Sequence, residues 1–172
     1  MILSYRFRLY PTKTQKVALT QMLGSFCDLY NAALEQRITA YQRRGVALGY
    51  ADQALELKAV RSSDDDLGHY SFSAQQQVLR RLNKAFGAFF RRVKRGDKPG
   101  FPRFKSKTRF DSAEFRFGDG LTIQRKKEKK TTIILNPKPE QTIETDPKPI
   151  LRRNDRFTHR GYSILDLEYR VM

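Results

Sequence analysis

The sequence predicts an α+β fold in which helices are inserted between the first strand of a small sheet or barrel and its later strands. Three observations lead to this prediction. Apolar residues alternate with polar ones from Leu3 to Leu9, helical spacing follows from about residue 12 to 95, and short strand patterns return after Glu114. The order strand, helices, strands is typical of an α+β protein.

The opening strand has apolar side chains at its odd positions, so Arg6 and Arg8 share the opposite, outer face. Pro11 is expected to end this strand.

A long helix is predicted next, since Thr12 and Gln15 have the spacing of a capping box. Apolar residues then recur at steps of three and four, and Gly45 is suited to end the helix after Arg44. The stripe comprises Leu19, Leu23, Phe26, Tyr30, Leu34, Ile38 and Tyr41. Gly24 leaves open a break into two helices, as in a helix-turn-helix.

The middle of the chain offers weak candidates for metal ligands. A short helix is expected from Asp52 to Val60, followed by a polar loop with three aspartates at 64–66. These lack the spacing of a calcium loop, and His69 and His159 lack companion ligands. Cys27 sits at an apolar position of the first helix and is expected to be a buried thiol. We therefore predict no metal site and no cofactor.

A second long helix is predicted to begin after Ser73, with Gln76 completing a capping box, and to end at Gly96. One face is apolar, and cations occupy much of the rest. The apolar stripe is Leu79, Leu82, Phe86, Phe89 and Val93, and the cations are Arg80, Arg81, Lys84, Arg91, Arg92, Lys94 and Arg95. This pattern fits a wall of a nucleic-acid channel, but also a calmodulin-target or membrane-surface helix.

Residues 96–107 contain two prolines and two glycines and are expected to be extended. Strands are predicted at 114–117, 121–123 and 131–135, with a turn at 118–120. From Asn136 onward four prolines indicate a poorly structured tail or linker, with one further strand at 162–169.

The net charge of +16 over 172 residues is concentrated in one region. Residues 71–130 hold 18 basic and 5 acidic side chains, and eight of the twelve phenylalanines fall between Phe86 and Phe117. A localised excess of cations favours nucleic acid as partner, with a solvated basic face as the alternative. Rings among these cations either stack on unpaired bases or pack in the core.

The chain has no apolar run long enough to span a membrane, and its N-terminus does not resemble a signal peptide. We therefore expect a cytoplasmic protein without a membrane partner, with association with the nucleoid as an alternative.

Four segments, in this order and spacing, resemble the N-terminal part of the TnpB (OrfB) family of transposon-encoded proteins related to type V CRISPR effectors. They are Tyr5-Arg6-Phe7-Arg8-Leu9-Tyr10-Pro11-Thr12, Leu29-Tyr30-Asn31-Ala32-Ala33-Leu34-Glu35, the helix from Leu82 to Phe90, and Gly100-Phe101-Pro102-Arg103-Phe104-Lys105-Ser106-Lys107. The resemblance implies a wedge-type β-barrel, here incomplete, interrupted by a helical recognition lobe at about 12–95. It also implies a region, residues 1–123, that binds a structured guide RNA and helps to read double-stranded DNA.

After about Ile123 the resemblance ends, and residues 124–172 are predicted to be a divergent tail or linker. The RuvC-like nuclease domain of the family does not fit in the remaining residues, so no catalytic residue is predicted. We expect a truncated, nucleic-acid-binding member of a transposase-associated family. The alternatives are one piece of a split RNA-guided endonuclease, a non-functional remnant of a mobile element, and a ribosome- or membrane-associated basic protein.

The predicted nucleic-acid-binding residues are cations of the outer strand face, the basic helix and the extended segment, with one ring. They are Arg6, Arg8, Arg80, Arg81, Lys84, Arg91, Arg92, Lys98, Arg103, Phe104, Lys105 and Lys107. Such cations position a phosphate backbone without reading its sequence.

Overall fold

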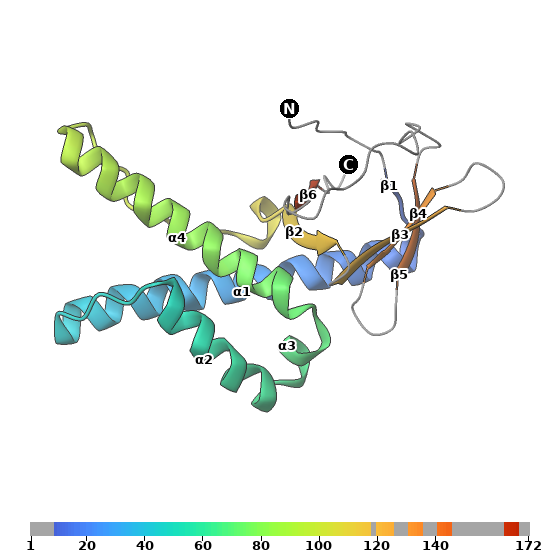
Figure 1. Ribbon diagram of the computed structural model, residues 1–172, viewed down its shortest axis with the longest axis horizontal. Helices are drawn as coiled ribbons and strands as arrows, with labels where there is room; N and C mark the ends of the chain where they lie inside the picture. The colour runs from blue at the N-terminus through green and yellow to red at the C-terminus, as the bar shows by residue number, and fades with distance from the viewer. Residues whose placement is uncertain (1–8, 118–119, 126–130, 136–140, 146–163, 169–172) are drawn as a thin grey trace.

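The structure, a computed structural model, describes the backbone of residues 9–117, 120–125, 131–135, 141–145 and 164–168, and side chains of residues 10–115. Two long helices cross at the centre of the molecule, and a sheet lies beside them (Figure 1). The strand predicted at 3–9 is therefore seen at its last residue alone, and Arg6 and Arg8 lie outside the described residues.

Helix α1 (Lys13–Arg44) has the predicted ends. Thr12 and Gln15 form the capping box, and Gly45 ends the helix in the left-handed conformation, with φ of 65°. The break considered at Gly24 is absent, because α1 continues through this residue as a single 32-residue helix.

Helix α2 (Tyr50–Ser63) is longer than predicted, and α3 (Asp65–His69) occupies part of the expected polar loop. Helix α4 (Phe72–Arg95) is capped by Ser71, whose hydroxyl accepts a hydrogen bond from the Ala74 amide, and not by Ser73. Gly96 ends α4 as predicted, with φ of 73°.

The strands form one sheet of order β1-β5-β4-β3-β2-β6. Their bounds are β1 Leu9–Tyr10, β2 Ser112–Phe117, β3 Gly120–Arg125, β4 Thr131–Leu135, β5 Gln141–Thr145 and β6 Ile164–Glu168. β2 and β3 pair in parallel, whereas the other pairs are antiparallel. β5 was not predicted.

The predicted fold class is wrong. Among residues 10–115, 74% are helical, including the short 3-10 turn, and 6% are extended. The described strands form an open row, because β1 and β6 lie at opposite edges and do not pair with each other. Closing a barrel requires its two edge strands to pair, so the wedge-type barrel interrupted by a helical lobe is not the observed architecture. The division into 1–123 and 124–172 stays a prediction.

The core lies between α1, α2, α4 and β2. Phe26, Leu34, Leu82 and Phe115 are almost fully buried there. The apolar stripes predicted for the two long helices are buried at their inner turns and emerge at their outer ones. Tyr41 on α1 is 67% exposed, and Val93 on α4 is exposed as well.

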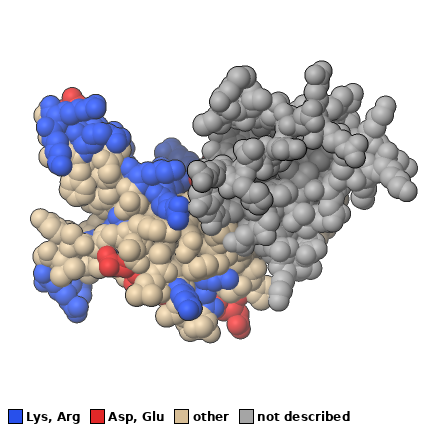
Figure 2. All heavy atoms as spheres, in the orientation of Figure 1, with Lys and Arg blue, Asp and Glu red and all other residues tan. Residues whose placement is uncertain are grey.

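The two long helices separate toward their C-terminal ends. Figure 1 shows the last turns of α4 projecting away from the end of α1, and Figure 2 shows an open notch between the two arms. The outer half of α4 is therefore an arm, and blue atoms of Lys and Arg cluster at its tip.

Candidate nucleic-acid interface

The extended segment after α4 turns back along the helix. The Arg92 guanidinium donates to the Gly100 carbonyl over 3.1 Å, and the Phe101 ring lies 5.6 Å from that of Phe86. Further along, Lys105 contacts Asn31 of α1. The segment therefore contacts α4 at Gly100 and Phe101 and α1 at Lys105, and the single binding surface stays a prediction.

Besides Arg92, two further predicted cations of α4 are held by other residues of the fold. Arg81 donates to the Ser112 carbonyl over 3.0 Å and to the Ser112 hydroxyl over 3.2 Å, and its guanidinium lies 5.2 Å from the Phe110 ring. It therefore joins α4 to β2. Arg80 donates to the Tyr50 hydroxyl over 3.1 Å and stacks on the same ring.

Other predicted cations are exposed and make no hydrogen bond or ion pair within the part of the chain that the structure describes. They are Lys84, Arg91, Lys98 and Arg103. Lys94, Arg95 and Arg109 share this property but were not among the predicted site residues. The sequence could have indicated these three residues, because all of them lie within the basic region 71–130.

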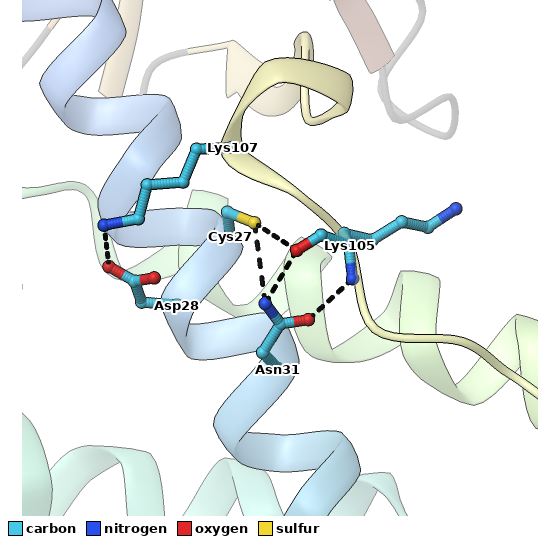
Figure 3. A network of polar contacts seen from close by, with 5 residues as sticks. All are labelled: Cys27, Asp28, Asn31, Lys105 and Lys107. Atoms are coloured by element: carbon cyan, nitrogen blue, oxygen red, sulfur yellow. Dashed lines mark hydrogen bonds and ion pairs between the residues drawn. The ribbon is translucent and has the colours of Figure 1, made fainter.

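A cluster of hydrogen bonds, which we call the polar clamp, holds the extended segment after α4 (residues 96–107, hereafter the basic segment) against α1 at Lys105. The Asn31 side chain accepts a hydrogen bond from the Lys105 amide over 2.8 Å and donates one to the Lys105 carbonyl over 2.9 Å. The Cys27 thiol donates to the same carbonyl over 3.3 Å. Figure 3 shows that the backbone of Lys105 faces α1 while its side chain extends away from the helix.

The neighbouring cation Lys107 is not free. Its Nζ lies 2.8 Å from the Asp28 carboxylate (Figure 3). The hydrogen bond and the charge of Asp28 raise the pKa of Lys107. The two side chains are 66% and 59% exposed, so water screens this ion pair and a phosphate can compete for the lysine.

Cys27 is buried, as predicted. Burial, and secondarily the charge of Asp28, raises the pKa of its thiol, so the protonated form that donates to Lys105 is favoured.

The aromatic residues of the segment divide by exposure. Phe110 is 3% exposed, and its ring packs 6.1 Å from that of Tyr30. Phe104, the predicted site ring, is 57% exposed, so a ligand could reach it.

Arg37 is a buried cation that the sequence analysis did not single out. It is 7% exposed and donates to Gln53 over 2.8 Å and to Asn83 over 3.3 Å, and it lies 5.1 Å from the Phe86 ring. One guanidinium nitrogen, Nη2, has no hydrogen-bond partner among the described residues. Burial lowers the pKa of Arg37, although the charge of Asp52 opposes this. The sequence could have indicated Arg37, because it is a cation between two residues of the apolar stripe, Leu34 and Ile38.

The three aspartates belong to a helix terminus. Asp64 accepts from the Leu67 amide as the cap of α3, and Asp65 and Asp66 lie in its first turn. Within the described residues, no group of three His, Cys, Asp or Glu could hold a metal ion.

In the described part of the chain, none of the helices combines the length and apolar character needed to cross a membrane.

Comparison with known proteins gives two matches. Residues 1–46 match the family model described as "Helix-turn-helix domain", of the OrfB proteins of IS605 type. In the described structure this range holds β1 and the whole of α1. A Streptomyces pristinaespiralis protein named "Putative RNA-guided DNA endonuclease" is 31% identical over 106 residues, covering 60% of this chain. The chain spans about a quarter of the length of that relative, 25%.

Proposed function

The chain is a member of the TnpB (OrfB) family through its N-terminal region, and from this premise we propose that it binds nucleic acid through a basic surface. We define this surface as Lys84, Arg91, Lys98, Arg103, Lys105 and Lys107. Arg6, Arg8 and Arg92 are proposed as further contacts, together with the ring of Phe104.

The proposal rests mainly on cations that are exposed and have no ion-pair partner among the described residues. Lys84, Arg91, Lys98 and Arg103 are exposed without an ion pair in the described residues. Mutual repulsion of such charges is unfavourable, and a phosphate backbone relieves it by replacing condensed counterions. The returning segment adds the cations of 98–107 to those of α4.

The name of the Streptomyces relative supports a more specific form of the proposal. An RNA-guided endonuclease handles RNA and DNA, and we propose that this chain binds a structured guide RNA and double-stranded DNA. A cytoplasmic location near the nucleoid is part of the same proposal. Since the proposed contacts are to phosphates, they position the nucleic acid without reading its sequence.

The test is charge reversal at Arg103 and Lys105. Arg103→Glu with Lys105→Glu should weaken binding to labelled RNA and DNA of unrelated sequences alike, by roughly tenfold or more, because two phosphate contacts are lost. The logarithm of the wild-type affinity should fall linearly with the logarithm of salt concentration, and the slope should be about two units smaller in the double variant.

A matched control is Lys58→Glu on α2, which changes an exposed cation outside the basic surface. Its affinity should stay near wild type after correction for net charge. Binding that does not depend on salt, or equal losses in the control and the double variant, would contradict the proposal.

A further inference from the structure

Four phenylalanines form a connected cluster on the outer half of α4, which we call the phenylalanine cluster: Phe86, Phe89, Phe90 and Phe101. Phe90 lies 5.1 Å from Phe89 and 6.3 Å from Phe86, between ring centroids. Phe101 of the returning segment lies 5.6 Å from Phe86 and 5.3 Å from Phe89, edge to face. Such edge-to-face contacts hold rings in defined orientations.

The cluster is anchored on its inner side and open on its outer side. Arg37 lies 5.1 Å from the Phe86 ring, and Phe86 packs against the core. The outer rings are only half covered, since Phe90 is 55% and Phe101 is 48% exposed. Packing alone does not explain them, because exposed phenylalanine at the end of an arm gives up the free energy of burial.

The charge around the cluster selects the kind of occupant. Between Lys84 and Phe110 the sequence has ten basic residues and one acidic residue, Asp97. Arg91, Lys94 and Arg95 are exposed and form no ion pair in the described part of the chain. An apolar protein surface docking here would leave these cations unpaired, whereas a polyanion with flat apolar rings would match both features.

We propose that the phenylalanine cluster is a stacking platform for unpaired bases of a single-stranded stretch of nucleic acid. Phe90 and Phe101 contact base faces, while the neighbouring cations contact the phosphates. A duplex hides its base faces by stacking, so exposed rings favour single strands, loops or ends. The inference rests on the proposed function and goes further, because it names the form of the nucleic acid.

The experiment distinguishes protein contacts to bases from protein contacts to phosphates. Binding is measured by fluorescence anisotropy at low salt with three probes: single-stranded oligothymidylate, a strand of equal length with abasic sites, and a duplex. Phe90→Leu and Phe101→Leu remove a ring and keep an apolar side chain. Each should weaken oligothymidylate binding roughly tenfold and leave abasic and duplex binding unchanged, since one base stack is lost.

Tyr41→Leu is the matched control, because Tyr41 is an exposed ring on α1 outside the cluster. It should leave all three affinities unchanged. Thermal unfolding followed by circular dichroism checks that each variant is folded, which half-exposed positions should permit.

Several results would overturn the inference. Equal wild-type affinity for intact and abasic strands, with both depending on salt, would leave phosphate binding intact and remove the stacking platform. Equal losses for abasic and intact strands in Phe90→Leu would mean that the ring acts through the fold. Absence of binding to every probe would overturn the proposed function together with the inference.

Discussion

The side-chain amide of Asn31 pairs with the backbone of Lys105 in the way that a peptide group of a neighbouring strand would. Its amide is complementary to the Lys105 backbone, with donor to acceptor distances of 2.8 and 2.9 Å. Because both backbone groups of Lys105 are satisfied, the segment can lie against α1 without belonging to a sheet. The lysine side chain is consequently turned outward (Figure 3).

Replacing Asn31 by alanine should release this clamp. We expect Asn31→Ala to lower the free energy of unfolding by about 1–2 kcal/mol, because two hydrogen bonds are lost and the Lys105 amide keeps no protein partner among the described residues, while the Lys105 carbonyl retains the Cys27 thiol. Chemical denaturation measures the loss, and hydrogen exchange should show reduced protection of the Lys105 amide.

Gln21→Ala removes an exposed amide of α1 that makes no side-chain hydrogen bond within the described residues, and it should change the free energy of unfolding by less than about 0.5 kcal/mol. If Asn31→Ala behaved in the same way, the clamp would have no energetic role.

The continuity of α1 depends on how Gly24 is used. A glycine inside a helical pattern predicts either a turn or a costly helical residue. Here the flanking side chains decide, since Leu23 and Phe26 are both buried when the helix continues. The basic segment also lies over Gly24, and a Cβ built there would meet Lys107 Cδ at 3.8 Å, an ordinary contact.

Gly24→Ala therefore should stabilise the protein by about 0.5–1 kcal/mol, because alanine loses less backbone entropy in a helix and fits the available space. The midpoint of thermal unfolding, followed by circular dichroism at the helical band, measures the effect.

Gly96→Ala is the contrasting variant. Gly96 has φ of 73°, where a Cβ is strained, so this variant should be destabilised by about 1 kcal/mol. A destabilised Gly24→Ala would indicate a turn at that position and contradict a continuous α1.

The charge of the whole molecule has two different uses. Residues 71–130 include 18 basic side chains, but some of these bind other helices or strands of the fold and are not available to a ligand. Arg81 joins α4 to β2, and Arg37, outside the block, joins α1 to α2 and α4. Arg91, Lys94 and Arg95 lie on the arm with no such contacts among the described residues.

Neutralising one residue of each kind should separate stability from binding. Arg81→Gln should lower the free energy of unfolding by about 2 kcal/mol, since a charge-assisted contact to Ser112 and the packing on Phe110 are lost. Arg91→Gln should leave stability unchanged within about 0.5 kcal/mol and weaken nucleic-acid binding several-fold.

Denaturant titration and anisotropy on the same two variants supply the measurement. If Arg91→Gln unfolded the protein, or if Arg81→Gln altered salt-dependent binding alone, the division of the charge would be wrong.

Local signals were sufficient for much of the helical part. The capping box at Thr12 and the glycines at 45 and 96 were predicted, because each acts within one turn of the chain. The cap of α4 was misplaced from Ser71 to Ser73 since both serines precede an apolar run. The barrel was wrong because closure depends on which edge strands pair, and no short stretch of sequence records that.

For the site, the composition of the sequence located the basic region 71–130 but did not show which of its cations are free to bind a ligand and which contact other residues of the fold. Whether Arg81 and Lys107 are engaged depends on Ser112 and Asp28, which lie 31 and 79 positions away in the chain. The same holds for the rings, because Phe110 is buried against Tyr30 whereas Phe90 and Phe104 are exposed. Residue types and periodicity are local properties and can be read along the chain. Burial and the choice of partner arise when distant segments meet, so they followed from the folded arrangement of α1, α4 and the returning segment.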